Sequence, residues 1–476
     1  MIILIILAAV ALRLPGIDKS FQGDEFFSVM DARQFSAIPD ALMSDTHPPL
    51  YFYALHLWMK AGQSEAFLRI LSIIAGTGVC VLAYLIGSTS FGKTAGIVSA
   101  LIVTVSPVMV WSSQYVRTYS MACFFTVMSV YMLVLFLKSG GRGRVKWVAF
   151  VISSAAAIYT FYFSALIIIA ENIYIFIFMR RERYFIKNWI ISQIAILALY
   201  VPWMPFFLYQ MSSYVAHPQM VQEAGFYFGG MHVGAIIRSL SGIAGFDPRL
   251  LAKGVMSASS YLKIASSAVV AVAGAYGVYL ATRYSKLPEF NSEEKRYMAL
   301  FIILAAAPFT IALFLHQTAR IILMSHYFIA SFVFLAIVLT ALTGRVWSRA
   351  GQAAFLSFVL ILFAARLACL YQDKEMDLKG AHNYVKALAE TGIPVVAPSF
   401  GGMFDYYFFD VPKRYTMDSA PAMTISSPEI IVVAYPEKLE LTDLNKRFGS
   451  SLAKRNYILK DSKRFGDLVV ERYSRS

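Results

Sequence analysis

Residues 118–138 read TYSMACFFTVMSVYMLVLFLK, a run of twenty uncharged residues that ends at Lys138. A helix of about 20 residues rises about 30 Å, which matches the hydrocarbon thickness of a membrane. Similar runs recur along the chain, for example at residues 67–90, 94–112 and 327–343. The pattern predicts a mainly α-helical, polytopic membrane protein.

By this criterion we expect about eleven transmembrane helices. The first run, residues 1–16, lacks the basic start of a signal peptide and is expected to be retained as a span. The other runs lie near residues 67–90, 94–112, 118–138, 146–161, 163–179, 188–207, 262–282, 298–315, 327–343 and 352–371.

The composition agrees with this class of protein. Hydrophobic residues make up 58% of the chain and charged residues 15%, whereas an ordinary soluble domain has about 25% charged residues. The formal net charge of +14 comes from basic residues between the apolar runs, so we interpret them as topology signals and expect no nucleic-acid partner. Cys80, Cys123 and Cys369 lie singly within apolar runs, a pattern that predicts neither a disulfide nor a zinc site.

Basic residues gather in alternate loops between the predicted helices, and the positive-inside rule assigns such loops to the cytoplasm. The N-terminus is then cytoplasmic and the C-terminus external, which suits an integral protein of a bacterial inner membrane. The loops carry Lys138, Arg142, Arg144 and Lys146; Arg180, Arg181, Arg183 and Lys187; Arg283, Lys286, Lys295 and Arg296; and Arg345 and Arg349.

On this assignment we divide the chain into a transmembrane domain, residues 1–371, and an extracytoplasmic domain, residues 372–476. The transmembrane domain carries external loops at residues 14–66 and 208–261. In the tail, the helix-like GAHNYVKALAE and LTDLNKRF alternate with the strand-like IPVVAP, EIIVVAY and DLVVERY. This alternation predicts a small α/β domain.

The first external loop holds the most suggestive polar residues. Asp24 and Glu25 follow the first span directly, and a carboxylate at the membrane boundary can act as a general base or bind a divalent cation. The same pair is also favourable at the N-terminus of a helix, and the dipeptide alone leaves both interpretations open. Further on, Asp45 and His47 precede Pro48-Pro49, which keeps the chain extended and fixes His47 at the membrane surface.

Two other clusters share the predicted external face with this loop. The segment QYVRTYS contributes Gln114, Arg117 and Tyr119, and the connection before residues 327–343 contributes Arg320 and His326. A guanidinium at the edge of an apolar helix is a suitable partner for a lipid phosphate. Snorkelling of these long side chains to the interface is the alternative.

Other polar residues are interpreted more simply. His217, Glu223 and His232 in the second external loop match no metal-binding spacing and are expected to be solvated. Tyr159, Tyr162, Tyr200 and Tyr209 are typical of the aromatic belt at a membrane interface.

The motifs ALRLPGI, GDEFFSV, THPPLYF, QYVRTYS and YVPWMPFF follow one another over about the first 210 residues. In this order and topology they resemble the GT-C glycosyltransferases of the family-39 type. That family includes protein O-mannosyltransferases and bacterial enzymes that add aminoarabinose or other sugars to lipid A. The later spans and the tail fit the general layout of the family without a sharp motif.

The resemblance implies a sugar donor on a polyprenyl phosphate, used at the outer face with inversion at the anomeric carbon. It implies that Asp24 activates the acceptor hydroxyl and that Glu25 supports it, with a divalent cation as a possible cofactor of the pair. The acceptor is a lipid, a glycan or a protein, and membrane lipids surround the spans.

The resemblance also implies a phosphate-binding set and a substrate pocket. His47 and Arg117 match motif positions for the phosphate, whereas Arg320 and His326 are added from the predicted topology. The pocket set consists of Asp45, Gln114, Tyr119 and Tyr162. Many relatives carry a histidine in a THY-like motif where residues 159–163 of this chain read YTFYF, so no donor contact is transferred to that position.

Two other functions remain open at this point. An O-antigen-type polymerase or ligase would also have many spans and a large external loop, with its catalytic arginines and histidines in a late loop. A transporter of lipid-linked sugars would carry inverted repeats and charges near the midplane. No repeat is visible here, and the polar residues gather at the predicted external boundary, which favours the transferase.

Overall fold

The computed structural model describes residues 1–216, 290–319, 325–372, 377–389, 392–397, 402–411, 413–416, 427–434 and 450–475. The chain divides into two compact units. The first contains Met1–Ile17, Asp31–Gln63 and Phe67–Tyr371. The second contains Asp18–Met30, Ser64–Ala66 and Gln372–Ser476, so the tail forms a unit with two short segments from the start of the chain.

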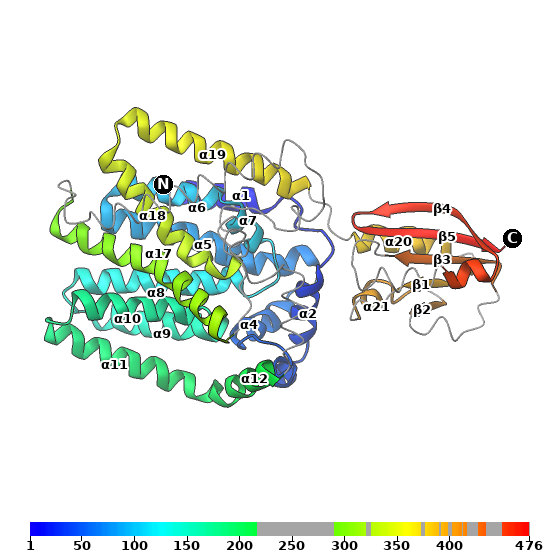
Figure 1. The fold of residues 1–476 in the computed structure, drawn as a ribbon, viewed down its shortest axis with the longest axis horizontal. Helices are drawn as coiled ribbons and strands as arrows, with labels where there is room; N and C mark the ends of the chain where they lie inside the picture. Colours follow the sequence, from blue (N-terminus) through cyan, green and yellow to red (C-terminus); the bar gives the residue numbers. More distant parts are fainter. Residues whose placement is uncertain are drawn as a thin grey trace. The chain divides into compact units, whose positions relative to one another are not determined.

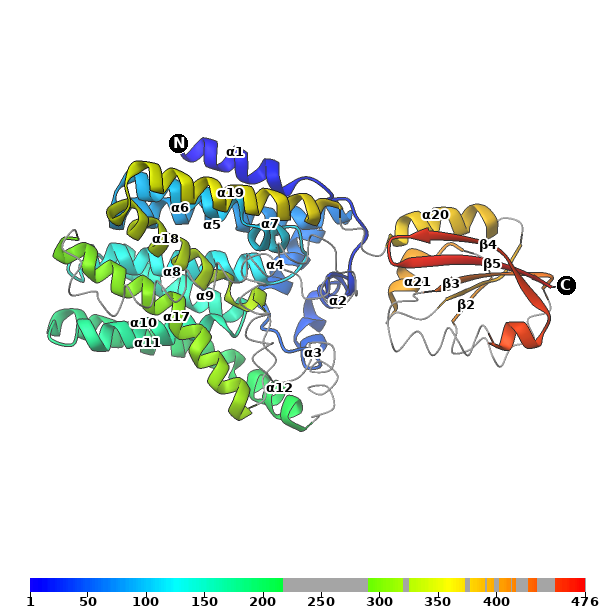
Figure 2. The same cartoon turned by 45° about the horizontal axis from the view of Figure 1, so that its top comes forward.

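The first unit is a bundle of helices, many of which run in nearly the same direction (Figure 1, Figure 2). Its helices are α1 (Ile2–Arg13), α3 (Ile38–Leu42), α4 (Leu50–Met59), α5 (Glu65–Phe91), α6 (Lys93–Val105), α7 (Pro107–Ser113), α8 (Tyr119–Lys138), α9 (Arg144–Thr160), α10 (Ser164–Phe178), α11 (Arg183–Tyr200), α12 (Met204–Ala216), α17 (Ser292–Ala319), α18 (Ile329–Val346) and α19 (Arg349–Gln372). Short 3₁₀ turns lie at Phe35–Ala37, Val201–Trp203 and Ser325–Phe328.

The predicted span count is only partly reproduced. Among the described residues, six helices are long and apolar enough to cross a membrane, or seven if α6 and α7 form one broken span. The predicted run at residues 262–282 lies outside the described residues, and the other predicted runs all fall on helices. The count of eleven is not confirmed, because α1, α9 and α10 have only 12, 17 and 15 residues.

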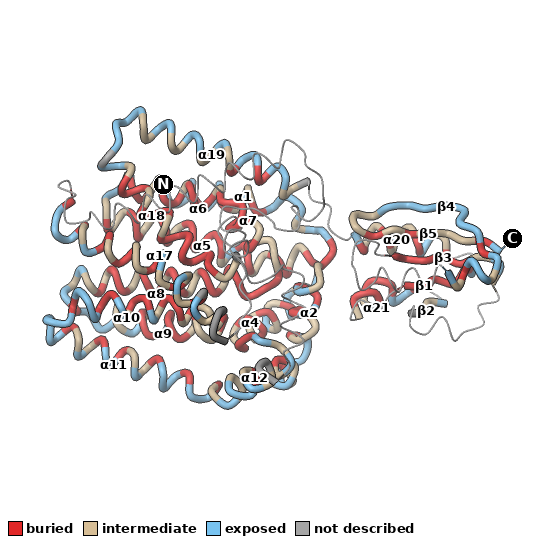
Figure 3. The backbone as a smooth tube through the Cα atoms, viewed as in Figure 1, coloured by how far each residue is buried: buried red, intermediate tan, exposed pale blue. Residues whose placement is uncertain are grey.

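Burial distinguishes the inner helices of the bundle from the outer ones. Within its most apolar stretch, α18 is 72% buried, whereas α19 is only 11% buried (Figure 3). The outer helix nevertheless exposes large apolar side chains, including Phe358 and Ile361. An apolar surface of this kind is stable against lipid rather than water, in agreement with the membrane assignment.

The span predicted at residues 94–112 is broken in its middle. α6 and α7 meet at a 62° bend between Val105 and Pro107, where the proline lacks the N–H that would continue the helix. Arg13, which is fully buried, donates to the carbonyl of Thr104 at 3.4 Å and to Ser113 Oγ at 3.0 Å. A buried guanidinium therefore satisfies polar groups on both sides of the break.

The second unit contains a five-stranded sheet with helices, as predicted for the tail. Its elements are α2 (Gly23–Asp31), α20 (Leu378–Ala389), β1 (Val395–Ala397), α21 (Met403–Tyr407), β2 (Arg414–Thr416), β3 (Glu429–Ala434), β4 (Tyr457–Phe465) and β5 (Leu468–Arg475). The strand order is β2-β1-β3-β5-β4. β1 pairs in parallel with β2 and β3, while β3–β5 and β5–β4 are antiparallel.

The sheet agrees with the predicted strands and adds two. IPVVAP, EIIVVAY and DLVVERY form β1, β3 and β5, and the predicted helix GAHNYVKALAE forms α20. The additional strands, β2 and β4, lie at the two edges, and β4 is largely exposed and rich in lysine and arginine, as is typical of an edge strand. The predicted helix LTDLNKRF lies outside the described residues.

Candidate functional site

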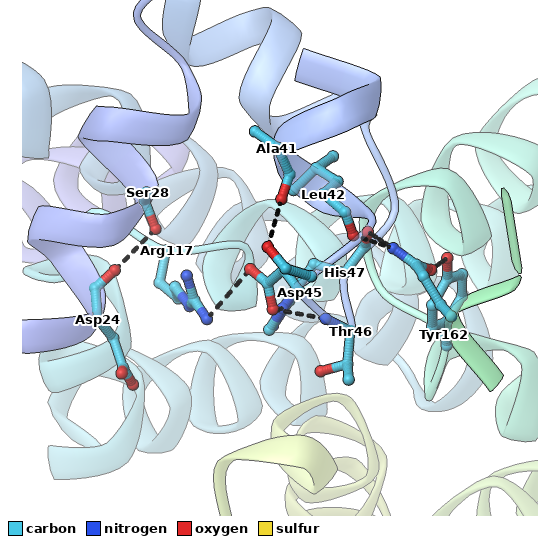
Figure 4. Close-up of polar contacts among 11 residues, drawn as sticks. Asp24, Ser28, Ala41, Leu42, Asp45, Thr46, His47, Arg117 and Tyr162 are labelled. Atoms are coloured by element: carbon cyan, nitrogen blue, oxygen red, sulfur yellow. Dashed lines mark hydrogen bonds and ion pairs between the residues drawn. The ribbon is translucent and has the colours of Figure 1, made fainter. Parts of the chain in front are cut away.

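An acid and a histidine in the first loop of the bundle form a tight local pair. His47 Nδ1 lies 2.7 Å from Asp45 Oδ1, which also accepts the backbone N–H of Thr46 at 2.6 Å (Figure 4). Pro49 immediately precedes α4, so the prolines end the extended loop and start the helix. This local geometry holds the buried imidazole of His47 in one orientation.

Arg117 reaches the same carboxylate from the turn between α7 and α8. Its Nη2 atom lies 3.7 Å from Asp45 Oδ2, and only 9% of its side chain is exposed (Figure 4). A contact of this length is an ion pair without a short charge-assisted hydrogen bond. The structure thus brings together Asp45, His47 and Arg117, which the sequence assigned to the pocket and to phosphate binding.

The pKa values of two acids in this cluster, Asp45 and Asp31, are shifted in opposite directions. Burial acts to raise the pKa of Asp45, but His47 and then Arg117 outweigh it and hold the pKa well below its usual range. Burial and the neighbouring charge of Asp45 raise the pKa of Asp31 to about 6, despite an opposing effect of Arg117. Asp45 is therefore ionised at neutral pH, whereas Asp31 gains and loses its proton at a pH of about 6.

Asp31 was not identified from the sequence. It is the last residue of α2, where an acid opposes the helix dipole, and that unfavourable position is the available signal. Its electrostatic interaction with Asp45 and Arg117 depends on segments far apart in the chain, which no local pattern reveals.

Asp31→Asn should make the protein more stable at pH 8. Because the folded-state pKa of Asp31 exceeds its usual value of about 4, ionised Asp31 destabilises the fold fully above about pH 6, and this effect vanishes as the pH falls toward 4. We expect a gain of about 1 kcal/mol at pH 8 after allowing for solvent screening. Melting temperatures in detergent from pH 4 to pH 8 would measure it.

Asp45→Asn is the matched control for this pH series. The pKa of Asp45 is lowered, so its ionised form stabilises the fold and the stabilisation is lost as the pH falls. The variant should therefore be destabilised at pH 8. A lower melting temperature for Asp31→Asn at pH 8 would contradict the raised pKa.

Gln210 of α12 supports the loop that carries the cluster. Its amide nitrogen donates to the carbonyls of Leu42 at 2.6 Å and His47 at 3.2 Å, and its amide oxygen accepts the hydroxyl of Tyr162. Tyr162 in turn accepts a hydrogen bond from Trp203 Nε1 at 2.9 Å. The predicted pocket residue Tyr162 thus acts here through Gln210, which is 2% exposed and was missed in the sequence.

Gln210→Leu should destabilise the bundle by about 3 kcal/mol, because it removes three hydrogen bonds at a buried place, those to the carbonyls of Leu42 and His47 and that from the hydroxyl of Tyr162. The corresponding fall in melting temperature is about 5 °C. Gln352→Leu is the control, since the Gln352 amide also donates to two carbonyls, of Gly344 and Trp347, at a more exposed place. Equal melting temperatures for the two variants would contradict the bracing role of Gln210.

A narrow aromatic crevice begins next to His47. The ring of Phe161 stacks on His47 at 5.9 Å and meets the rings of Tyr119 at 6.1 Å and Tyr327 at 5.1 Å. His326 lies 4.3 Å from the Tyr119 ring, so two more predicted site residues share this region. Phe161 lies in the YTFYF segment and gives the crevice an apolar wall.

The deeper part of the crevice carries small polar groups. Thr126 Oγ1 of α8 donates to Ser164 Oγ of α10 at 3.1 Å, and both line the cavity together with Cys123 and Ser331. The volume of the cavity is about 20 Å³, which is enough for about one water molecule. A lipid chain would need these helices to separate further.

Gln114 has a different environment. Its amide nitrogen donates to the carbonyls of Arg13 at 3.0 Å and Pro15 at 2.7 Å. The amide therefore holds the end of α1 against the turn that carries Arg117. The sequence analysis assigned Gln114 to the substrate pocket, whereas in this structure its amide nitrogen binds two backbone carbonyls.

Asp24 and Glu25 belong to the second compact unit, at the start of α2. Glu25 is fully buried, and its Oε2 accepts the backbone N–H of Gln22 at 2.9 Å, as in a capping box. Asp24 is exposed, and its backbone carbonyl accepts the hydroxyl of Ser28 at 2.9 Å (Figure 4). The two acids thus differ: one caps the helix and the other points outward.

Some predicted residues lie outside the described part of the chain, namely Arg320 and the second-loop residues His217, Glu223 and His232. Among the residues that are described, no group of three or more histidine, cysteine, aspartate or glutamate side chains could hold a metal ion. The pair Asp24–Glu25 supplies one exposed carboxylate, because that of Glu25 is engaged in the cap.

Residues 46–208 match the model of a family described as dolichyl-phosphate-mannose-protein mannosyltransferase. The matched stretch includes His47, Arg117 and Tyr162. No match was found among curated protein sequences.

Solved structures of similar fold are membrane enzymes of archaea and bacteria. The Archaeoglobus fulgidus oligosaccharyltransferase AglB, in complex with an inhibitory peptide and a dolichol-phosphate, is 12% identical with a TM-score of 0.52, covering 100% of this chain and 74% of that chain. A second structure of this enzyme, with Zn and sulfate, is 13% identical with a TM-score of 0.54, covering 96% and 71%. ArnT from Cupriavidus metallidurans, bound to undecaprenyl phosphate, is 12% identical with a TM-score of 0.46, covering 99% and 97%. At these identities the likeness to AglB shows the fold.

Proposed function

We propose that this chain is a GT-C glycosyltransferase, as the family match and the shared fold support, and that it moves a sugar from a polyprenyl phosphate to an acceptor hydroxyl at the external face of the membrane. The observation that carries the proposal is the convergence of Arg117 and His47 on Asp45 at one end of a bundle of apolar helices. The guanidinium of Arg117 and the imidazole of His47 can both donate hydrogen bonds to a phosphate, and their position at the end of a membrane bundle suits a lipid-linked phosphate.

The phosphate of the donor is assigned to Arg117 and His47. A guanidinium has five N–H groups in a planar fork that matches phosphate oxygens. Asp45 holds the imidazole of His47 by a 2.7 Å contact and so orients its other ring nitrogen. His326, and Arg320 outside the described residues, complete the predicted basic set.

The reaction needs one base and one leaving group. The acceptor oxygen attacks the anomeric carbon, the bond from that carbon to the phosphate oxygen breaks, and the polyprenyl phosphate leaves with the bonding electrons. The acceptor proton passes to the carboxylate of Asp24, which acts as the general base. Attack opposite the leaving group inverts the anomeric carbon.

Glu25 supports this role by fixing the start of α2 through its contact with Gln22. A divalent cation would be held by Asp24 and Glu25, of which Asp24 is the exposed member.

The basic loops of the sequence support the external face, because the positive-inside rule predicts a cytoplasmic N-terminus and an external site, here in a bacterial inner membrane. The names of similar proteins support a prenyl phosphate as carrier, because AglB was solved with a dolichol-phosphate. The acceptor class stays open among lipids, glycans and proteins.

Transfer of a labelled sugar from a synthetic undecaprenyl-phosphate sugar, measured in proteoliposomes with a mixed acceptor extract, would test the proposal. We expect labelled product together with release of undecaprenyl phosphate. Movement of intact donor across the bilayer without cleavage would favour the transporter, and joining of pyrophosphate-linked oligosaccharides would favour the polymerase or ligase.

A further inference from the structure

The segment that carries Asp24 is built into the same compact unit as the C-terminal sheet. Asp18–Met30 and Ser64–Ala66 belong to this unit together with Gln372–Ser476. The exposed carboxylate therefore depends for its place on contacts with a part of the chain that lies 359 to 386 residues away in the sequence. Three kinds of contact make this attachment.

The first kind of contact is aromatic packing. Phe21 and Phe26 are 0% and 2% exposed, and both meet the ring of Tyr406, at 6.3 and 5.6 Å. Burial of two phenylalanines is worth about 2 kcal/mol each. Because Glu25 and Phe26 face inward, Asp24 is left on the exposed side of α2.

The second kind of contact is a pair of hydrogen bonds made by the hydroxyl of Tyr407. It accepts the backbone N–H of Phe21 at 2.7 Å and donates to Glu65 Oε1 at 3.1 Å. Tyr407 is 8% exposed, and burial raises the pKa of its hydroxyl far above the usual range, so it stays protonated and able to donate. One oxygen atom thus connects the segment leading into α2 to Glu65, the first residue of α5.

The third kind of contact is the set of polar contacts made by Lys379. Its Nζ atom lies 2.7 Å from Glu65 Oε2 and donates to the carbonyl of Asp18 at 3.0 Å. Its backbone N–H donates to Ser20 Oγ at 3.0 Å. Glu65, which is 9% exposed, therefore has one carboxylate oxygen on Tyr407 and the other on Lys379.

We propose that Tyr407, with Lys379 and Glu65, is a positioning residue that sets the location of Asp24 for the transfer reaction. This inference rests on the proposed function of Asp24. Tyr407 fixes Phe21, three residues before Asp24, and a hydrogen-bonded anchor this close limits the movement of the helix start. The C-terminal unit accordingly contributes to turnover through α2.

Tyr407→Phe in the full-length protein is the test, because it removes the hydroxyl and keeps the ring. A misplacement of about 1 Å can cost about 100-fold in rate, so we expect kcat to fall 10- to 100-fold. The affinity for undecaprenyl phosphate should stay within twofold, since the Arg117 cluster is in the other unit. In an Asp24→Asn background the same substitution should have no further effect on the residual rate.

The matched control is Tyr384→Phe, which removes a hydrogen bond of 2.9 Å between α20 and Asp461 of β4 in the same unit. Its kcat should equal that of the wild type. Lys379→Met provides a second positioning variant, in which the backbone contact with Ser20 persists and kcat should again fall with donor affinity unchanged.

The outcomes separate the two claims. A wild-type protein that transfers no sugar would overturn the proposed function itself. An active wild type with unchanged kcat in Tyr407→Phe would overturn only the positioning role. A loss of rate that persists undiminished in the Asp24→Asn background would do the same, because Tyr407 would then act through another group.

Discussion

Asp24→Asn is expected to lower kcat by about 10²- to 10⁴-fold, the usual contribution of a general base. The amide has nearly the same shape as the carboxylate but cannot accept the acceptor proton. Asp24 is exposed, and the hydrogen bond from Ser28 goes to its backbone carbonyl, which the substitution leaves in place. Single-turnover transfer in proteoliposomes would measure the loss.

The control for this variant is Asp40→Asn, which removes an exposed acid from the same loop. It should retain wild-type turnover, and both variants should bind undecaprenyl phosphate normally. Wild-type turnover in Asp24→Asn would remove the catalytic assignment and leave the acid as part of the helix start.

Arg117→Ala is expected to weaken binding of undecaprenyl phosphate about 100-fold, or about 3 kcal/mol. Removing one partner of a buried charged contact costs about 2–5 kcal/mol, and only 9% of the Arg117 side chain is exposed. Arg117→Lys should recover part of the affinity, because an ammonium keeps the charge but loses the planar fork. Titration of the detergent-solubilised protein with the lipid would give both affinities.

Undecaprenol, which lacks the phosphate, is the control ligand for this experiment. Its affinity should be the same in wild type and Arg117→Ala, since only the phosphate contact is removed. If the affinities for undecaprenol and undecaprenyl phosphate fell equally, the substitution would have disturbed the binding of the prenyl chain. The phosphate would then need a partner other than Arg117.

The general architecture could be predicted because it follows from local patterns. Apolar runs mark membrane helices wherever they lie, and three alternating apolar segments marked β1, β3 and β5 in the tail. The break between α6 and α7 carried its own signal, Pro107, inside a run that we expected to be continuous. The span count was less accurate because short helices such as α1 and α10 satisfy the hydropathy pattern without reaching full length.

The candidate site was predictable only in part, for a related reason. Asp45, His47 and Arg117 lie in short motifs, and their convergence followed once the motifs were placed on one face. Asp31, Gln210 and Tyr407 act through contacts between distant segments, and each looks unremarkable in its own stretch of sequence. Tertiary partners of this kind require the fold to be known.

The composition of the second unit has a consequence for how the protein is made. Its first segment ends at Met30, whereas its sheet begins only after Gln372. At about 5–20 residues per second, a ribosome needs roughly 20–70 seconds to travel between them. During that interval the α2 segment must wait without its permanent partner, while the intervening helices are synthesised. On the proposed assignment of Asp24, the base is therefore positioned only at the end of synthesis, and a chain released early would carry the bundle without it.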